Sequence, residues 1–543
     1  MLLLRYLTSV FTLVDTFRFS CVFTAVLLLT RYVLRSKKQT LRLPPGPKGL
    51  PVVGNILQLG PNPHLTMTNF AKKFGAVYRL KLGSRMVIVV NGVDAIKQAL
   101  LRQPMDFVSR PEMHTTQYVC RGHSIVFGAM PVDEHRRYRK LIVDALGTYA
   151  LRKVNNDQNN NSQSVKASPV VERIVTEEVS DLAQRLLKNE LDSGHEVHGV
   201  TEDRKNMTGI FNEIAWTTSN IMSAFLFGER YQPGDSHIKF IIDNNNDFSR
   251  IQANSSAADM MPWTRYVIPG LLTKFKAVIK KFDDFMQEHI KKHVENFDNI
   301  YDWNKNNKTP VEPKNVLDGL IATARLNRGN PLYDEKHTLN TIVDLMGAGF
   351  DTISKSLMWI FVYSAVFKDA QEIIRREIDT FIHKEDRPPK YADRNHFPYT
   401  NAFIHEVLRH SSFVPFTIPH AVTRDNVRLL GYDMPKGTIV FINQWSVNYD
   451  VSVWKSPEHF RPERFLDADG MFQPEVGDRV LLFGMGRRAC PGKVLAKLEM
   501  FLYITQILRV CNLSMHPDHP GLPKTEYGLT MRPETGKMMV EPR

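Results

Sequence analysis

Hydrophobic and polar residues follow two different periods along this chain. Residues 76–83 (AVYRLKLG) alternate, residues 85–92 (RMVIVVNG) form a short apolar run, and each stretch ends at a glycine, which predicts a two-stranded hairpin. Further short strands are expected around 420–445. Elsewhere apolar residues recur at helical spacing, which predicts helices over 93–103, 134–146, 170–191, 274–297, 338–367 and 493–508. The pattern predicts a mainly α protein with small β-sheets.

The N-terminus carries a mostly apolar run, residues 19–34, followed by basic residues 35–42. Extended backwards through LTSVFTLV, the run approaches the roughly 20 residues that cross a bilayer. The basic flank favours the cytosol for the side that follows. We predict a membrane anchor over 1–35. A mitochondrial presequence is the alternative, because four arginines and a single acid, Asp15, stand in this segment.

Prolines dominate the next stretch, LRLPPGPKGLPVVGN, where they stiffen the backbone and forbid helix. This composition predicts a basic and proline-rich hinge over 36–55 between the anchor and a globular body. No Gly/Ser linker divides the remaining residues into comparable parts. We therefore expect 56–543 to form one domain.

Composition narrows the class of protein. Hydrophobic residues make up 43% and charged residues 23%, which is ordinary for a globular protein. The net charge of +13 is dispersed, and no zinc-finger, RNA-recognition or helix-turn-helix pattern stands out, so we expect no nucleic-acid partner. Four cysteines do not make a disulfide framework in 543 residues, which favours a domain that faces the cytosol.

One cysteine stands in a loop of unusual composition, FGMGRRACPG at 483–492. Glycines such as Gly484 leave room for a flat group to approach the backbone. A thiolate is a strong, soft iron ligand, and Cys490 precedes a predicted helix whose N-terminus would stabilise its negative charge. Arg488 would lie near a bound anion such as a haem propionate. The alternative is a buried, inert cysteine, the common fate of a lone one.

The apolar helix over 338–367 contains residues that weaken it. Gly347 and Gly349 each cost about 1 kcal/mol relative to alanine in a helix interior. Asp351 and Thr352 are polar in an apolar neighbourhood and need partners. We predict a locally opened turn with a hydroxyl and a carboxylate beside a ligand. The alternative is a helix crossing at the glycines, with the polar groups facing solvent.

A third group of residues predicts a charge cluster. Glu406 and Arg409 are i,i+3 neighbours in HEVLRH, and a proline-broken stretch at 456–465 carries Arg464. Taken alone, Glu406 and Arg409 are a surface ion pair worth a few tenths of a kcal/mol. Together with Arg464 they would hold the downstream segment under the cysteine loop.

With these residues assembled, the chain resembles the cytochromes P450 over about residues 40–543. Phe483, Gly486, Arg488, Cys490 and Gly492 match every fixed position of Phe-x-x-Gly-x-Arg-x-Cys-x-Gly. Three further motifs match at Ala348, Gly349, Asp351 and Thr352 for oxygen activation, at Glu406 and Arg409 for Glu-x-x-Arg, and at Pro457, Phe460, Pro462, Glu463, Arg464 and Phe465 for the meander. GAGFDT, FINQW and YGLTM are similar to the animal microsomal family-one enzymes, the aryl-hydrocarbon hydroxylases.

The resemblance implies a haem-thiolate catalytic domain with haem b, O2 and NADPH-derived electrons. Cys490 would be the axial iron ligand, and Thr352 and Asp351 would handle oxygen and protons. Structural roles would fall to Glu406, Arg409 and Arg464. The haem itself would be held by Arg488, Arg139, His420, His135, Phe483 and Gly484, with His135 where the family usually has tryptophan.

The resemblance also implies a lipophilic substrate, such as an aromatic xenobiotic, a steroid or a fatty acid. Phe248, Asp344, Ala348 and Thr116 are expected in its pocket, but the phenylalanine of the aryl-hydrocarbon group is missing near Thr116, which weakens the expectation of flat polycyclic substrates. The implied partners are NADPH-cytochrome P450 reductase, cytochrome b5 and membrane lipid, in the endoplasmic reticulum rather than mitochondria.

Three rival functions remain open at this point. A steroid 17-hydroxylase-like enzyme is a near relative. A P450-fold isomerase that uses no O2 is disfavoured by the intact Asp351-Thr352 pair. A haem-binding electron carrier without turnover would need no apolar substrate cavity.

Overall fold

The computed structural model describes residues 41–149, 151–154, 164–187, 207–268, 270, 272–301, 313–327, 329–330 and 335–543. The predicted membrane anchor, residues 1–35, lies outside the described residues. Within the described ranges, no helix combines the length and the apolar character that a membrane crossing requires.

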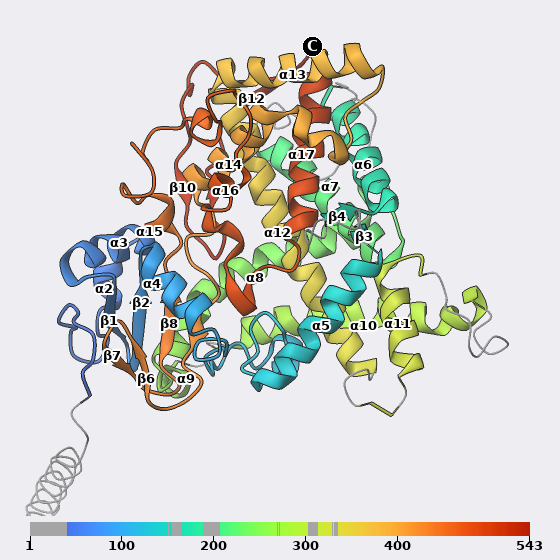
Figure 1. Cartoon of the computed structure of the whole chain (residues 1–543). Coiled ribbons are helices and arrows are strands. Elements are labelled where there is room, and N and C mark those ends of the chain that lie inside the picture. Colours follow the sequence, from blue (N-terminus) through green and yellow to red (C-terminus); the bar gives the residue numbers. More distant parts are fainter. Residues whose placement is uncertain are drawn as a thin grey trace, which may run out of the picture.

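Helices account for most of the structure (Figure 1). The α-helices are α2 (Ile56–Leu59), α3 (Pro63–Phe74), α4 (Val93–Lys97), α5 (Val132–Tyr149), α6 (Pro169–Leu187), α7 (Met207–Phe227), α8 (Ser236–Met260), α9 (Thr264–Val267), α10 (Thr273–Tyr301), α11 (Val316–Leu326), α12 (Glu335–Val366), α13 (Lys368–Glu385), α14 (Pro398–Ser411), α15 (Trp445–Asn448), α16 (Pro474–Gly477) and α17 (Lys493–Val510). Shorter turns of 3₁₀ or π helix are η1 (Gln98–Arg102), η2 (Val119–Gly122), η5 (Tyr391–His396), η6 (Pro462–Phe465), η7 (Leu481–Phe483) and η8 (Gly486–Arg488).

The largest sheet has four strands in the order β1-β2-β8-β5 and lies at the lower left of Figure 1. The predicted hairpin is confirmed, because β1 (Val77–Leu82) pairs antiparallel with β2 (Arg85–Val90). β2 then pairs in parallel with β8 (Ile439–Ile442), and β8 pairs antiparallel with β5 (His420–Ala421). Two-stranded sheets complete the structure: β3 (Leu151–Val154) with β4 (Ser164–Ala167), β6 (Val427–Leu429) with β7 (Tyr432–Met434), β9 (Cys511–Met515) with β12 (Met538–Pro542), and β10 (Thr525–Glu526) with β11 (Arg532–Pro533).

The hydrophobic core lies among the long helices, with α12 and α17 at its centre (Figure 1). α17 is buried on every side, from Leu498 to Leu508. A helix that is buried all round belongs in a core. Its N-terminal end carries the cysteine loop, so the buried core positions that loop. The prediction of a mainly α fold with small sheets is confirmed.

The described part of the predicted hinge is packed rather than free. The amide of Arg79 donates to the Pro45 carbonyl (2.8 Å), and the amide of Asn55 donates to the Lys81 carbonyl (2.6 Å). Gly46 leaves no room for a side chain, because a Cβ there would lie 2.0 Å from the Arg79 carbonyl oxygen. Residues 45–55 therefore run along β1 and fix where the chain enters the domain.

Candidate functional site

A cavity of about 440 Å³ lies inside the helical body. It is bounded by α7, α8 and α10 on one side, by the middle of α12, and by the cysteine loop with the first turns of α17. Most of its wall is apolar, and Phe127, Phe225 and Phe282 contribute aromatic rings. The cavity is thus an apolar chamber with the cysteine loop at one end.

The cysteine loop aims Cys490 into this cavity. The Cys490 amide donates to the Phe483 carbonyl (2.8 Å), which closes the loop. Gly486 has φ +70°, and a Cβ at this position would lie 2.2 Å from the Leu100 carbonyl oxygen, so only glycine fits there. Phe483 and Gly484 lie in the same wall of the cavity.

The Cys490 thiol is accessible from the cavity although protein surrounds it. Burial raises the pKa of the thiol, while the Gly492 amide and the positive charges of Arg139 and Lys493 lower it. A metal ion that binds here would displace the thiol proton, because a coordinating thiol is deprotonated.

Three arginines, Arg110, Arg139 and Arg488, line the cavity beside the cysteine loop. Arg488 donates to the carbonyls of Val108 (2.7 Å) and Ile125 (2.8 Å). Arg110 donates to the carbonyls of Val126, Ile418 and Pro419.

Burial lowers the pKa of Arg488 to about 8, and the positive charges of Arg110 and Arg139 add to this effect. Burial lowers the pKa of Arg110 to about 9. No carboxylate of the described residues pairs with any of the three arginines. This arrangement is a buried cluster of positive charge that suits an anionic group.

Two histidines lie in the same region. Burial and the neighbouring arginines lower the pKa of His135 to about 3, so its ring is neutral and can donate one hydrogen bond. His420 differs, because its Nδ1–H donates to the Phe107 carbonyl (2.6 Å) and its pKa is also lowered by burial. A neutral His420 therefore offers only an acceptor to an anion. The expected His420–propionate bond would require a protonated ring, which bound carboxylates would favour.

These residues fit haem. A thiol faces a chamber whose glycine-rich wall approaches closely, and unpaired arginines beside it match the two carboxylates of the porphyrin. The predicted set Cys490, Arg488, Arg139, His135, Phe483 and Gly484 lies together around one end of the cavity.

The predicted opened turn is not present, because α12 runs without interruption from Glu335 to Val366. The Thr352 hydroxyl donates to the Ala348 carbonyl (2.9 Å), one turn back, so it follows the helix rather than opening it. Gly349 serves a helix crossing: a Cβ there would lie 2.4 Å from the Met222 side chain of α7. Gly347 has open space beside it and lines the cavity.

Asp351 and Thr352 both lie in the cavity wall. Both carboxylate oxygens of Asp351 already accept hydrogen bonds from protein groups. Its Oδ2 accepts from Lys355 Nζ (2.8 Å) and from the Thr530 hydroxyl (3.0 Å), and its Oδ1 accepts from Asn245 Nδ2 (2.8 Å). Three elements therefore meet at one carboxylate: α12, α8 and the loop before β11.

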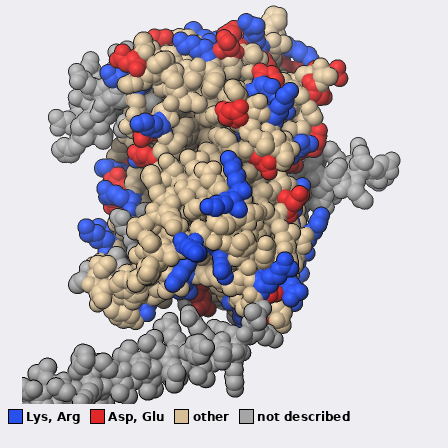
Figure 2. All heavy atoms as spheres, turned by 90° about the vertical axis from the view of Figure 1, so that its left-hand side faces the viewer, with Lys and Arg blue, Asp and Glu red and all other residues tan. Residues whose placement is uncertain are grey.

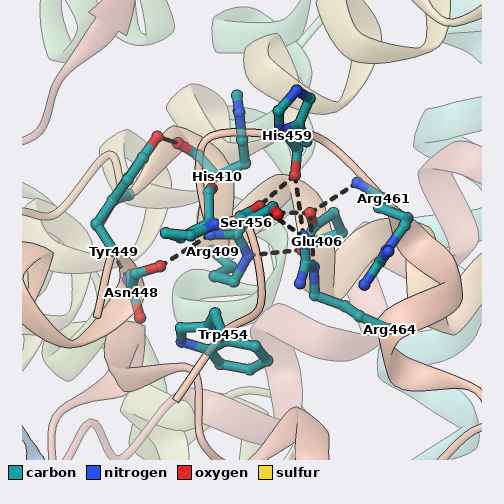
Figure 3. A network of polar contacts seen from close by, with 12 residues as sticks. Glu406, Arg409, His410, Asn448, Tyr449, Trp454, Ser456, His459, Arg461 and Arg464 are labelled. Carbon is teal, nitrogen blue, oxygen red and sulfur yellow. Dashed lines mark hydrogen bonds and ion pairs between the residues drawn. The ribbon is translucent and has the colours of Figure 1, made fainter. Parts of the chain in front are cut away.

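The structure brings Glu406, Arg409 and Arg464 together (Figure 3). Glu406 and Arg409 are completely buried and form two hydrogen bonds of 2.7 and 2.8 Å. Arg464 Nε lies 3.1 Å from Glu406 Oε1. The alternative of a surface ion pair is therefore wrong.

The cluster also reaches the backbone of the segments around it. Arg409 donates to the carbonyls of Asn448 and Pro457 (both 2.8 Å), and the Arg461 amide donates to Glu406 Oε1 (2.8 Å). The side chain of Asn448 in turn accepts from the Leu481 amide (3.4 Å), two residues before the cysteine loop. The charges thus tie a segment without regular secondary structure to the base of that loop.

Of the predicted pocket residues, Phe248, Asp344 and Ala348 line the cavity, and Thr116 does not. The Thr116 hydroxyl donates to the Met113 carbonyl (3.1 Å) within its own loop. Asp344 is buried and accepts from the Ser124 hydroxyl and the Ile125 amide (both 2.6 Å). Burial raises its pKa to about 6 against these donors.

Sequence reasoning missed several charged residues in or beside the cavity. Arg110 stands in a loop without a periodic signal. Lys355, which pairs with Asp351 but does not itself line the cavity, resembles an ordinary polar position of α12. Asp283 lies on the polar stripe of α10, yet it lines the cavity. Glu499 is buried in α17 with Oε2 unpartnered, and burial raises its pKa to about 8, so this carboxyl is mostly protonated at neutral pH.

Comparison with known proteins agrees with this geometry. The family model "Cytochrome P450" matches residues 44–540. Cytochrome P450 1A5 of Gallus gallus is 34% identical over 514 residues, which cover 94% of this chain and 92% of the relative. Cytochrome P450 1A1 is 33% identical in Macaca fascicularis over 516 residues (93% of this chain, 94% of the relative) and 33% identical in Rattus norvegicus over 496 residues (91% and 88%).

Proposed function

The chain belongs to the cytochrome P450 family and is a haem-dependent monooxygenase, and from this premise we propose which residues carry the activity. Cys490 would hold the haem iron through its thiolate, and the apolar cavity would hold a lipophilic substrate. The single observation that carries the proposal is a thiol facing an apolar cavity beside three arginines that have no carboxylate partner among the described residues.

The proposed division of labour leaves the redox chemistry to the cofactor. When bound, haem supplies O2 activation and the transfer of one oxygen atom to the substrate, with electrons derived from NADPH. Cys490 would ligate the iron through its thiolate, which donates electron density. Arg110, Arg139 and Arg488 would bind the propionates, with His135 as a neutral donor and His420 joining as an imidazolium.

We propose that the outer side of α5 is the docking surface for the electron donor. Its inner side carries His135 and Arg139, and its outer side exposes Arg136, Arg137 and Lys140, with Arg487 of the cysteine loop also exposed. An acidic partner is complementary to this basic surface. NADPH-cytochrome P450 reductase is the proposed partner, because the activity needs NADPH-derived electrons.

Proton handling is assigned to the middle of α12. The Thr352 hydroxyl lies in the cavity wall and could turn from the Ala348 carbonyl to donate a hydrogen bond into the cavity. Asp351 connects Lys355 Nζ and the Thr530 hydroxyl to the same wall. Lys355 would supply a proton through the Asp351 carboxylate, and Thr352 would hold it at the cavity.

Thr352→Ala tests this function. We expect the haem-loaded variant, reconstituted with reductase, to keep consuming NADPH while product per NADPH falls by about tenfold or more, because general acid–base steps contribute at least that much. Hydrogen peroxide should account for the missing electrons. Thr352→Ser keeps the hydroxyl and should stay near the wild-type ratio. Full coupling in Thr352→Ala would contradict the role of Thr352, and absence of NADPH-dependent product in the wild type would contradict the function.

The endoplasmic reticulum membrane is the proposed location, supported by exposed apolar side chains at one corner of the domain. Two contacts form the corner. Residues 45–55 run along β1, and the turn after β1 meets the end of α8. At that meeting point the Ser84 amide donates to the Met260 carbonyl (2.9 Å). We call it the apolar corner; its exposed members are Leu50, Val52, Leu57, Trp263, Tyr266, Val267 and Ile268.

The face of the protein beside the apolar corner is basic, which suits contact with anionic lipid headgroups. Figure 2 shows the left-hand face of Figure 1, where basic side chains predominate over acidic ones in the lower half, with uncharged surface between them. Apolar side chains inserted between headgroups, together with basic residues around them, bind membranes.

Trp263 reports on this contact. In vesicles of phosphatidylcholine and phosphatidylserine with brominated acyl chains, we expect bromine to quench more tryptophan fluorescence in the wild-type chain than in Trp263→Phe. The difference in quenching between the two proteins reports on Trp263 alone among the six tryptophans. Equal quenched fractions would show that the apolar corner stays in water.

A further inference from the structure

The cavity wall carries charges of both signs. The arginines lie at the cysteine end, where haem propionates would account for them. The wall also carries four acids, which are Asp283, Asp344, Asp351 and Glu499. An apolar cavity that holds only neutral molecules has no need of carboxylates in its wall, because each one loses hydration there.

Three of these acids are accounted for within the protein. Asp351 pairs with Lys355. Asp344 accepts two hydrogen bonds of 2.6 Å, from the Ser124 hydroxyl and the Ile125 amide. Glu499 is mostly protonated at neutral pH, because burial raises its pKa to about 8.

Asp283 is the exception. It lies on α10 beside Ile279 and Phe282, which line the same wall, and no described residue forms a hydrogen bond or ion pair with its carboxylate. Its sequence neighbour Asp284 points outward instead and pairs with Lys280. The two adjacent acids therefore separate into one that faces solvent and one that faces the cavity.

A positively charged ligand group would complete this site. A half-buried carboxylate without a partner gains most from a cation, which offsets the lost hydration. Phe282 and Phe248 line the same cavity, and aromatic faces attract ammonium groups. The remaining wall is apolar and suits a lipophilic body.

The geometry points to lipophilic substrates that carry an ammonium group, with Asp283 as their counter-ion in the cavity. This inference rests on the proposed function, because it names the substrate class of the same cavity. It makes Asp283 a specificity-determining residue, which holds the cationic end of the molecule on α10.

A matched pair of ligands tests the inference. (2-Naphthylmethyl)trimethylammonium and 2-(2,2-dimethylpropyl)naphthalene have the same shape, differ in one positive charge and cannot ligate iron. Their dissociation constants are measured with the haem-loaded full chain by the Soret shift and by equilibrium dialysis. We expect Asp283→Asn to weaken the cation by about tenfold or more relative to the hydrocarbon, a loss of the size expected for a desolvated charge pair.

Two further variants serve as controls for this result. Asp284→Asn removes the neighbouring, outward-facing acid and should leave the ratio of the two dissociation constants unchanged. Asp283→Glu keeps the charge and should retain the preference for the cation. A ratio that Asp283→Asn does not alter would overturn the inference. Failure of both ligands to bind the wild type would instead contradict the proposed substrate cavity.

The wild-type chain provides an independent measurement, because the trimethylammonium ligand does not titrate. Burial raises the pKa of Asp283 to about 6. The positive charge of Arg121 opposes this rise, and the negative charge of Asp284 adds to it. Asp344 and Cys120 also lie close to Asp283. On the adjacent α8, Asp247 pairs with Arg250. Below pH 6 Asp283 takes up its proton, so affinity for the cation should fall between pH 7.5 and pH 5 while that for the hydrocarbon stays constant. Parallel behaviour of the two ligands would overturn the inference.

Discussion

Replacing Cys490 by alanine is expected to abolish NADPH-dependent product formation and the thiolate-type spectrum of the reduced, CO-treated protein. Cys490 offers the thiol that faces the cavity, next to Arg139 and Lys493, whose charges favour the thiolate. The other two cysteines among the described residues, Cys120 and Cys511, are buried. Burial raises the pKa of all three thiols, but neither Cys120 nor Cys511 lines the cavity, so neither can reach a group bound there.

Cys511→Ala is the matched control, since Cys511 lies in β9 and is not among the residues that line the cavity. This variant should keep both the spectrum and the turnover. Retention of thiolate-type absorbance in Cys490→Ala, or its loss in Cys511→Ala, would assign the ligand to another residue.

The second large effect is expected from Arg409→Met. Removing one partner of a buried ion pair costs about 3–5 kcal/mol, because the other charge stays buried without compensation. Here Glu406 would keep only Arg464 and the Arg461 amide, and the carbonyls of Asn448 and Pro457 would lose their donor. Denaturant unfolding of the haem-loaded protein should show a loss of this size, together with a lower yield of haem-loaded protein.

An exposed ion pair supplies the comparison for Arg409. Lys239 and Asp243 form an i,i+4 pair on α8 with both side chains more than half exposed. Lys239→Met should change the free energy of unfolding by about 0.5 kcal/mol or less. Similar losses in the two variants would mean that the Glu406–Arg409 pair is no more important than a surface contact.

The sequence could predict the parts of the site whose chemistry is local. Cys490, Arg488 and the glycines stand within ten residues, and their spacing is fixed by one loop. Glu406 and Arg409 are one helical turn apart. For such groups residue type and spacing are enough, because no distant segment has to be placed first.

Residues that depend on long-range packing could not be predicted in this way. Arg110 reaches the cavity because its guanidinium bonds to carbonyls of Ile418 and Pro419, more than 300 positions away. Asp283 and Asp284 are equivalent in the sequence, and only the packing of α10 over the cavity distinguishes them. Thr116 was expected in the cavity wall by resemblance, but its loop turns its hydroxyl to Met113.

The opened turn in α12 was predicted from residue types that weaken helices. The structure keeps the helix, because packing outweighs propensity: Gly349 admits the Met222 side chain of α7, and Thr352 bonds back to Ala348. The same glycines therefore support a close helix crossing and leave Gly347 open to the cavity.

The bond between Cys490 and iron is the claim on which the other assignments depend. Its most direct measurement is the absorbance spectrum of the wild-type chain, expressed with haem, reduced and treated with CO. A thiolate ligand predicts a Soret maximum near ~450 nm. Protein that binds no haem, or whose band lies at the shorter wavelength of a nitrogen-ligated haem under gentle handling, would contradict the account.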